Sequence, residues 1–294
     1  MIDVRNLTRR FGALTAVDDV SFQVPDGAVT GFVGGNGAGK TTTMRMIMGL
    51  LGTDDGEVFW DDHVITTAER RSIGYMPEER GLYPKQSVLD QLVYFAMLSG
   101  MSREAARSDA LDYLTRFGLV ERASERVEKL SLGNQQRVQI IASLIHRPQA
   151  LVLDEPFSGL DPVAVDQMVE ILRDQTGRGV PVLFSSHQLD LVERLSDRVV
   201  ILAAGRVVAS GGVDELRERA GVHHRLVMDG DVSWLTDSPL VRSVEREPRG
   251  ALVTLTQTDG ADQLLLREAV DRGAVHEFVR VVPSLTEIYR EVSV

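Results

Sequence analysis

The sequence predicts an α/β fold built on a parallel sheet that is buried on both faces, followed by a smaller α+β domain. Short apolar runs without polar alternation predict the strands of the sheet, notably 29–33, 150–153 and 180–184. A helical pattern follows each run, and strands that alternate with helices in this way are covered on both faces. Each run ends near Gly, Asp or Ser, and ligands bind at the carboxyl ends of strands in such sheets.

Composition narrows the class of protein. The chain has 294 residues, with 32 Lys and Arg against 43 Asp and Glu, so its formal net charge is −11. This acidic balance disfavours binding of nucleic acid by phosphate neutralisation. The absence of cysteine excludes disulfides, thiolate nucleophiles and cysteine-ligated metals. The longest apolar run, 199–204, is too short to cross a bilayer, and the N-terminus lacks a signal-peptide pattern, so we expect a soluble intracellular protein.

The first 60 residues are expected to add antiparallel strands and a helix to the sheet. Residues 20–24 and 57–60 predict strands of an antiparallel edge, with turns at 26–27 and 55–56. Apolar residues recur at helical spacing over 41–51, directly after the strand 29–33 and a glycine-rich segment.

A helical subdomain is expected within the α/β core. Apolar residues lie at helical spacing between 87 and 118, and we place the subdomain at about 87–148. The α/β domain that contains it is predicted to span residues 1–212.

Residues 213–294 predict a small α+β accessory domain. Its last helix is expected to begin at Ser284, because Ser284 and Glu287 form a capping-box pattern. The other expected elements are strands at 226–228, 251–256 and 277–282 and a helix at 263–270. This domain is too short and too poor in special residues to suggest chemistry of its own.

The glycine-rich segment 34–41 reads GGNGAGKT and fits the pattern G-x-x-x-x-G-K-[ST]. Glycines allow backbone N–H groups to approach phosphate oxygens, and the helix after Gly39 adds its positive end. Lys40 can reach β- and γ-phosphates, and the Thr41 hydroxyl can bind Mg²⁺. The alternative is a plain glycine-rich turn, but the order of strand, loop, Lys-Thr and helix favours a phosphate site.

Acidic and histidine side chains follow the next two strands. Asp154 can hold Mg²⁺, and Glu155 can orient and deprotonate an attacking water. His187 can hydrogen-bond the γ-phosphate, although a lone histidine is more often structural. Because all three follow strands of one parallel sheet, we expect them at the same edge as the glycine loop.

A second anion site is predicted at the start of a later helix. Ser131 is a candidate N-cap for a helix that continues to about residue 145, and Ser131 and Gly133 lie at its N-terminus. One chain cannot readily bring two helix N-termini to one γ-phosphate, whereas a second copy of the chain can.

These motifs, in this order, resemble the ATPase subunit of an ABC transporter over residues 1–212. Residues 34–42 resemble the Walker A loop, 130–134 the signature sequence, 151–155 Walker B and 158–161 the D-loop. The resemblance makes His187 the switch histidine and Phe11 the aromatic that stacks on adenine, although Phe11 could also be a core residue. The nucleotide-binding residues that it implies are Phe11, Gly34, Asn36, Gly37, Ala38, Gly39, Lys40, Thr41, Thr42, Ser131, Gly133 and Asp161.

Departures from the family pattern narrow the subgroup. Glu78 stands where the family usually has the glutamine that senses Mg²⁺. A glutamate can also bind Mg²⁺, as Thr41 and Asp154 are expected to do, but it adds negative charge beside ATP. Gly35 replaces a common proline, which is a mild change. Residues 77–84 and 130–136 are similar to a bacterial exporter subgroup of sodium-efflux and drug-export ATPases, whose small C-terminal domain ends in a motif like Pro-Ser-Leu at 283–285.

The resemblance implies an ATPase, with ATP and Mg²⁺ as ligands, that powers export through a separate membrane permease. Glu155, His187 and Lys40 would be catalytic, and each ATP would lie between two ATPase subunits that form a homodimer or a heterodimer. The chain would be cytoplasmic and peripheral on the inner face of the cell membrane. The permease is expected to dock near 78–83 and the helical region after 87, unless Leu82, Tyr83 and Leu92 are ordinary core residues.

Three alternatives remain at this point. An ABC ATPase that acts on nucleic acid or ribosomes is disfavoured by the single glycine loop, the three lysines and the lack of a long heptad run. A regulatory module without hydrolysis is disfavoured by Asp154, Glu155 and His187, and an importer only by the subgroup resemblance. The pair His223-His224 invites a metal site, but neighbouring side chains point apart, so we interpret it as a solvated linker.

Overall fold

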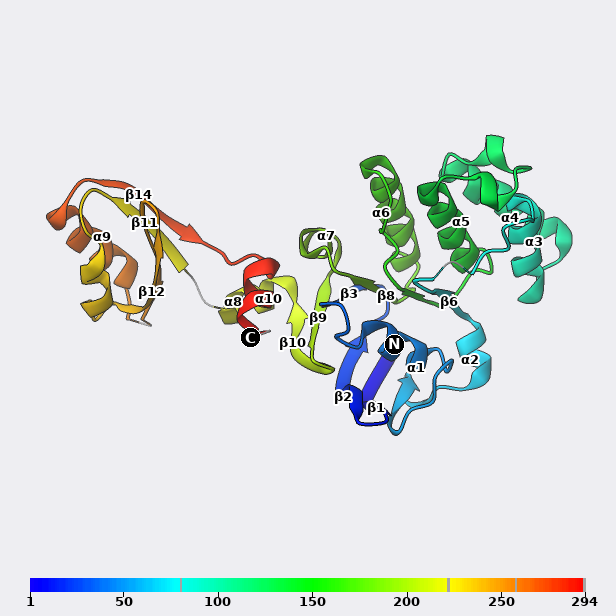
Figure 1. Cartoon of the computed structure of the whole chain (residues 1–294), viewed down its shortest axis with the longest axis horizontal. Coiled ribbons are helices and arrows are strands. Elements are labelled where there is room, and N and C mark those ends of the chain that lie inside the picture. The colour runs from blue at the N-terminus through cyan, green and yellow to red at the C-terminus, as the bar shows by residue number, and fades with distance from the viewer. Residues whose placement is uncertain (80, 221–222, 257, 293–294) are drawn as a thin grey trace. The chain divides into compact units, whose positions relative to one another are not determined.

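The computed structural model describes residues 1–79, 81–220, 223–256 and 258–292. The chain divides into two compact units, Met1–Gly212 and Val213–Val294 (Figure 1). Within the described part of the chain, no helix is both long and apolar enough to cross a membrane.

The predicted parallel sheet is confirmed at the centre of the first unit. Its strand order is β10-β9-β3-β8-β7-β6, and all neighbours run parallel except β10, which pairs antiparallel with β9. Every residue of β3, β7 and β8 is buried, as the unbroken apolar runs indicate. The strands are β3 (Val29–Gly34), β6 (Ile73–Met76), β7 (Ala150–Leu153), β8 (Val182–Ser186), β9 (Arg198–Ala203) and β10 (Arg206–Gly212).

The antiparallel strands form a sheet of their own, and not an edge of the parallel sheet. Its order is β2-β1-β4-β5, with β1 (Ile2–Phe11), β2 (Leu14–Val24), β4 (Asp55–Trp60) and β5 (His63–Val64). The turn at 26–27 is present, but the turn predicted at 55–56 is wrong, because both residues begin β4. Gly56 has φ +79°, and a Cβ there would lie 2.3 Å from the Asn6 carbonyl oxygen, so close approach to β1 explains this glycine.

Helices cover both faces of the parallel sheet. Helix α1 (Lys40–Ile47) and the antiparallel sheet lie on one side, and α6 (Pro162–Thr176) and α7 (Leu189–Leu195) lie on the other (Figure 1). Apolar side chains of the antiparallel sheet, α1 and the central strands share one core. Helix α1 ends before the predicted residue 51, because Gly49 takes a left-handed φ of +69°. A short helix, α2 (Thr67–Arg71), precedes β6.

The helical subdomain contains α3 (Val88–Leu98), α4 (Arg103–Arg116) and α5 (Leu132–Leu144), with short 3₁₀ turns at Val120–Arg122 and Val127–Lys129. Ser87, Ser102 and Ser131 cap the three helices, and each hydroxyl accepts a backbone N–H three residues later. The capping role predicted for Ser131 is therefore present.

The second unit is a four-stranded antiparallel sheet with a helix packed on one face. The sheet order is β12-β13-β11-β14, and Leu226, Val253 and Leu265 share its buried core with other apolar residues. At the last helix Ser284 and Glu287 exchange hydrogen bonds, as the capping-box pattern predicts. The elements are α8 (Val213–Ala220), β11 (His223–Met228), a 3₁₀ turn η3 (Ser233–Asp237), β12 (Val241–Glu247), β13 (Gly250–Leu255), α9 (Ala261–Arg272), β14 (Val275–Val281) and α10 (Leu285–Val292).

The interpretation of His223-His224 as a solvated linker is wrong. Both residues belong to β11, and His224 is 8% exposed with its ring stacked on Phe278. The alternation of a strand turns His224 toward the core and His223 away from it.

Candidate active site

Three adjacent parallel strands bring the predicted residues to one edge of the sheet. Strands β3, β8 and β7 are neighbours, and they end just before the glycine loop, His187 and Asp154 respectively. Parallel strands expose their carboxyl ends at the same edge, so segments far apart in sequence meet there.

The glycine loop closes around the side chain of Lys40. Lys40 is 8% exposed, and its Nζ donates to the carbonyl oxygens of Gly34 at 2.7 Å and Gly35 at 3.2 Å. Gly39 immediately precedes α1 and has φ +104°, and a Cβ there would lie 2.6 Å from the Ala16 carbonyl oxygen. A Cβ on Gly37 would meet no atom within 4 Å, so the outer side of the loop is open to a ligand.

A cleft of about 440 Å³ lies over the loop. Phe11 is 48% exposed at its rim, so the alternative that Phe11 is a core residue is wrong. Sequence reasoning missed Leu14, which carries no signal beyond its nearness to Phe11. Ala16 belongs to the segment that resembles the family around Phe11, but it was not predicted to line the cleft. The lining residues are Phe11, Leu14, Ala16, Gly35, Asn36, Gly37, Ala38, Gly39, Lys40, Thr41, Thr42, Glu78, Asp154 and Glu155.

Asp154 is buried with one carboxylate oxygen bound and the other free. Its Oδ1 accepts the Ser185 hydroxyl at 2.5 Å, and the residue is 1% exposed. Within the described residues its buried Oδ2 has no hydrogen-bond partner. A buried carboxylate oxygen without a donor is unfavourable unless a cation or ligand completes it.

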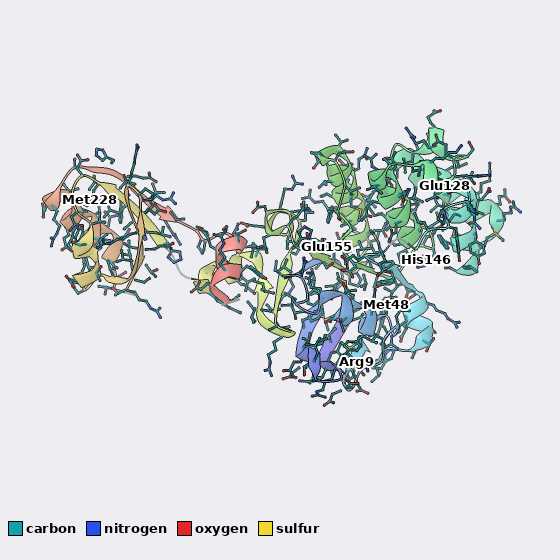
Figure 2. All side chains as sticks on the ribbon, in the orientation of Figure 1. Arg9, Met48, Glu128, His146, Glu155 and Met228 are labelled. Carbon is teal, nitrogen blue, oxygen red and sulfur yellow. The ribbon has the colours of Figure 1, made fainter. Side chains whose placement is uncertain are left out.

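Glu155 (labelled in Figure 2) has an unusual backbone conformation, with φ +50°. Its N–H donates to the Ser185 hydroxyl at 2.8 Å, and the Gln136 amide donates to its carbonyl oxygen at 3.1 Å. Its Oε2 lies 2.9 Å from His187 Nδ1. Ser185 and Gln136 are positioning residues that the sequence did not single out, because only the fold brings them to residues 154 and 155.

The residues at this edge fit a magnesium ion bound jointly with phosphate. The free Oδ2 of Asp154 and the Thr41 hydroxyl are oxygen donors, and Mg²⁺ commonly takes one or two protein oxygens beside substrate phosphates. Glu78 is exposed, and its Oε2 lies 3.5 Å from the Thr41 hydroxyl. In the described part of the chain no three His, Asp or Glu side chains cluster as a self-sufficient metal site.

Four predicted nucleotide-binding residues do not line this cleft in the described chain: Gly34, Ser131, Gly133 and Asp161. Gly34 ends β3, and its carbonyl oxygen accepts a hydrogen bond from the Lys40 ammonium. The Ser131 hydroxyl accepts the Asn134 N–H at 3.3 Å, and a Cβ on Gly133 would lie 2.8 Å from the Gly159 carbonyl oxygen. Asp161 caps α6 and pairs with Arg137 at 2.7 Å. The hydrogen bond from the Ala164 N–H is the main reason that the pKa of Asp161 lies below its usual range.

Residues of α2, β6, α3 and α5 line a mainly apolar groove. Leu82, Phe95 and Leu98 contribute apolar surface, while Arg70 and Arg71 add positive charge. Burial lowers the pKa of His146, which also lines this groove.

Three apolar residues were predicted either to contact the permease or to belong to the core, and they differ in exposure. Tyr83 is 49% exposed, Leu92 belongs to the core, and Leu82 is intermediate. Arg80, within the predicted docking segment, lies outside the described residues.

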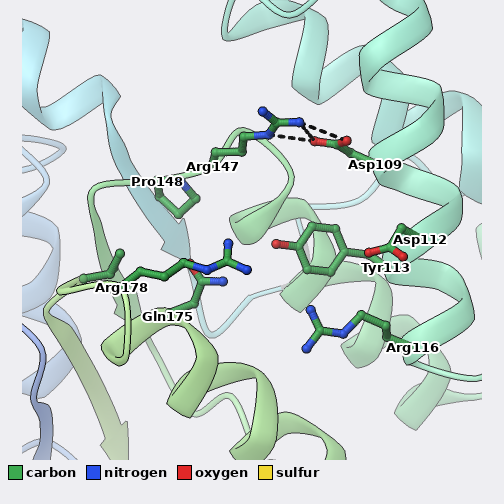
Figure 3. Close-up of a pocket in the computed structure, with 9 residues that line it drawn as sticks. Asp109, Asp112, Tyr113, Arg116, Arg147, Pro148, Gln175 and Arg178 are labelled. Atoms are coloured by element: carbon green, nitrogen blue, oxygen red, sulfur yellow. Dashed lines mark hydrogen bonds and ion pairs between the residues drawn. The ribbon is translucent and has the colours of Figure 1, made fainter.

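A further cleft lies between α4 and the end of α6 (Figure 3). Its ion pairs join the walls: Arg147 binds Asp109 through two nitrogens, and Arg116 pairs with Asp174 of α6. Burial raises the pKa of Tyr113, which also lines it. None of the sequence-predicted site residues lies here.

Comparison with known proteins covers both units. A family model described as "ABC transporter" matches residues 17–158, and one described as "ATP-binding protein DrrA1-3-like, C-terminal domain" matches residues 211–293. The chain is 37% identical over 292 residues to the "Uncharacterized ABC transporter ATP-binding protein YhaQ" of Bacillus subtilis, covering 99% of this chain and 98% of that protein.

Two further similar proteins each match about three quarters of this chain. "Nod factor export ATP-binding protein I" of Burkholderia orbicola is 36% identical over 220 residues, which covers 74% of this chain and 72% of that protein. A solved structure titled "Structure of ATP binding subunit of ABC transporter" is 33% identical with a TM-score of 0.70, covering 75% of this chain and 93% of that one.

Proposed function

This chain belongs to the family of ABC transporter ATP-binding subunits, and on that premise we propose that it hydrolyses ATP to power export through a separate membrane permease. The observation that carries the proposal is the meeting of Lys40, Asp154 and Glu155 at one cleft, with His187 bound to Glu155. The resemblance stated from the motifs is confirmed, and the comparisons give no support to a nucleic-acid or ribosome role.

Different residues at the cleft bind the phosphates and activate the attacking water. Backbone N–H groups of the glycine loop and the N-terminus of α1 face the phosphates, and Lys40 adds a charge beside the β- and γ-phosphates. Glu155 takes the proton of the attacking water, and His187 holds the Glu155 carboxylate toward the γ-phosphate.

Thr41 and Asp154, with Glu78 as a weaker candidate, would hold the Mg²⁺ ion. When bound, this ion supplies positive charge to the β- and γ-phosphate oxygens. Asp154 lines the cleft, and its Oδ2 has no hydrogen-bond partner among the described residues, which supports this assignment.

Two chains, identical or different, complete each ATP site. Ser131 and Gly133 start α5, yet they do not line the glycine-loop cleft of their own chain in the described residues. We therefore place ATP between the glycine loop of one subunit and the start of α5 of the other. ATP binding closes the pair, and phosphate release opens it.

The permease docks in the groove between α2, β6, α3 and α5. Arg70 and Arg71 at its edge favour an acidic end on the docking segment, and Leu98, which is 67% exposed, favours an apolar side chain. Docking there would hold the chain at the inner face of the cell membrane, while the membrane subunits select the cargo. Export is supported by the exporter-like segments 77–84 and 130–136 and by the printed name of the Nod factor relative.

Purification of the tagged chain with candidate permeases encoded in its source genome tests this function. A permease should co-purify in detergent and stimulate ATP hydrolysis, and Leu98→Glu should weaken the complex while ATP binding persists. Leu264→Glu is the matched control, because Leu264 is an exposed leucine on α9. Import of substrate by the reconstituted complex, or salt-sensitive binding of RNA or DNA in its place, would contradict the proposal.

A further inference from the structure

We propose that Arg9, anchored by Asp54, is a positioning residue that holds the Phe11 ring as the platform for the nucleotide base. The inference rests on the proposed function, because it requires ATP in the glycine-loop cleft with its base against Phe11. It extends the site to a pair of charged residues that do not touch the nucleotide.

A tight hairpin places Phe11 at the rim of the cleft. Phe11 ends β1 and pairs with Leu14, the first residue of β2, across a two-residue loop. Gly12 begins that loop with φ +60°, a conformation that hairpin loops of this length require and that glycine adopts without strain. The hairpin fixes the backbone of Phe11 but leaves its half-exposed ring with little packing of its own.

Arg9 supplies the missing contact on one face of the ring. Its guanidinium carbon lies 5.1 Å from the centroid of the Phe11 ring, within the range of a cation–π interaction. Among the described residues Phe11 lines the cleft, whereas Arg9 does not. The guanidinium therefore contacts the ring from outside the cleft, and the base would stack on the other face.

Asp54 fixes the guanidinium in turn. Its Oδ1 accepts Arg9 Nη1 at 2.7 Å, and its Oδ2 accepts the Arg10 backbone N–H at 2.6 Å. The Asp54 N–H donates to the Thr8 carbonyl oxygen at 3.0 Å. Both the backbone and the carboxylate of Asp54 are therefore hydrogen-bonded to β1. Arg9 lies on β1 in the antiparallel sheet (Figure 2), and its side chain is only 24% exposed.

This arrangement benefits a purine more than a bare phosphate chain. A ring held in one orientation loses less freedom when a base stacks on it, and a cation behind the ring lowers the negative charge of the face that meets the electron-rich base. Arg9 should therefore affect affinity for the base and leave the phosphate contacts and the hydrolysis step unchanged.

The test compares ATP with inorganic tripolyphosphate, which has no base. We expect Arg9→Ala to raise the KM for ATP by about threefold to tenfold, the loss of one partly shielded cation–π contact, with kcat unchanged. The inhibition constant of tripolyphosphate against ATP should not change. Arg9→Lys should recover part of the loss, and Asp54→Asn should give a smaller rise than Arg9→Ala.

Arg10→Ala is the matched control, because the Arg10 side chain is exposed and its backbone N–H to Asp54 is retained. Equal weakening of ATP and tripolyphosphate, a fall in kcat alone, or no change in Arg9→Ala would overturn the positioning role. Phe11→Ala distinguishes failure of the proposed base site from failure of the proposed role of Arg9. If it leaves the KM for ATP unchanged, the proposed base site itself is wrong; if it raises KM while Arg9→Ala does not, only the role of Arg9 fails.

Discussion

Glu155 has a left-handed backbone with φ +50° at the point where β7 ends. A non-glycine residue in this conformation costs about 1–3 kcal/mol, and it persists where the surroundings hold it. Here the Ser185 hydroxyl and the Gln136 amide bind the backbone of Glu155 from two elements. The sequence predicted the acidic residue at this place, but not its conformation, because the two groups that hold it are 30 and 19 residues away.

Replacing Glu155 should stop hydrolysis without stopping binding. A positioned general base contributes about 10²–10⁴-fold in rate, so Glu155→Gln should reduce turnover by that order. Phosphate release measures the rate, and nucleotide titration measures the dissociation constant, which should stay within about twofold of wild type by the same argument. Glu79→Gln is the control, because Glu79 is an exposed carboxylate that does not line the glycine-loop cleft in the described residues. Wild-type turnover by the Glu155→Gln protein would show that Glu155 is not the general base.

Lys40 should matter for ATP affinity. The Lys40 ammonium is nearly buried among the carbonyl oxygens of the loop. If Lys40 is removed, water therefore does not readily take over its contact with phosphate. Loss of a hydrogen bond to a charged group costs about 1.5–3 kcal/mol, so Lys40→Ala should weaken ATP binding about 10- to 100-fold. Calorimetric titration measures this change, with exposed Lys85→Ala as the control. An unchanged dissociation constant would show that the glycine loop is not the phosphate site.

At the scale of elements, the pattern of apolar residues predicted the parallel strands better than the segments between them. Apolar runs without alternation correctly gave β3, β7 and β8, because burial on both faces leaves that signature in the sequence. The end of α1 and the start of β4 were missed. Both depend on a glycine with positive φ, Gly49 or Gly56, and the sequence does not distinguish a helix end or a strand bulge from a turn.

The loop between β3 and α1 allows a comparison of two glycines. Both Gly37 and Gly39 have positive φ, but only a Cβ on Gly39 would meet a backbone atom, the Ala16 carbonyl oxygen at 2.6 Å. Gly39→Ala should therefore lower the free energy of unfolding by more than the roughly 1–3 kcal/mol expected from φ alone in Gly37→Ala. Chemical denaturation followed by Trp60 fluorescence measures both. Equal destabilisation would show that the contact with Ala16 does not constrain the loop.

At the scale of the whole molecule, the two units carry one tryptophan each, Trp60 and Trp234, so each can be followed separately. The second unit also shows where sequence interpretation failed. From the sequence, His223 and His224 are interpreted as a solvated linker because neighbouring side chains point apart and no nearby third metal ligand is evident. The alternation of β11 instead buries His224 against Phe278.

Burial of His224 makes the second unit sensitive to acid. Burial is the main reason that the pKa of His224 lies below its ordinary 6.5, and the nearby Asp262 opposes the shift. The unfolded chain then takes up a proton at higher pH than the folded one. Stability should fall as pH drops below about 6.5 and level off below the folded-state pKa.

Urea unfolding of a Trp60→Phe protein, read by Trp234, measures this dependence between pH 8 and pH 5. His224→Leu should remove the loss between those values, whereas His223→Gln should retain it. A His224→Leu protein with the wild-type pH dependence would assign the effect to another group.

The separation of Ser131 and Gly133 from the glycine-loop cleft has a consequence for assembly. If each ATP site takes its second wall from another chain, a subunit that binds but cannot hydrolyse ATP should remain paired. Gly133→Asp should prevent this pairing for two reasons. A carboxylate at the start of α5 repels the γ-phosphate, and the added Cβ would lie 2.8 Å from the Gly159 carbonyl oxygen, so the start of α5 must also shift.

The most direct measurement is the mass of the Glu155→Gln protein by light scattering, with and without Mg-ATP. We predict the mass of one 32.4 kDa chain without nucleotide and of two chains with it. The Glu155→Gln, Gly133→Asp double variant should remain a single chain while still binding ATP. A single-chain mass for Glu155→Gln at saturating ATP, with binding verified by titration, would contradict an ATP site shared between two copies of this chain.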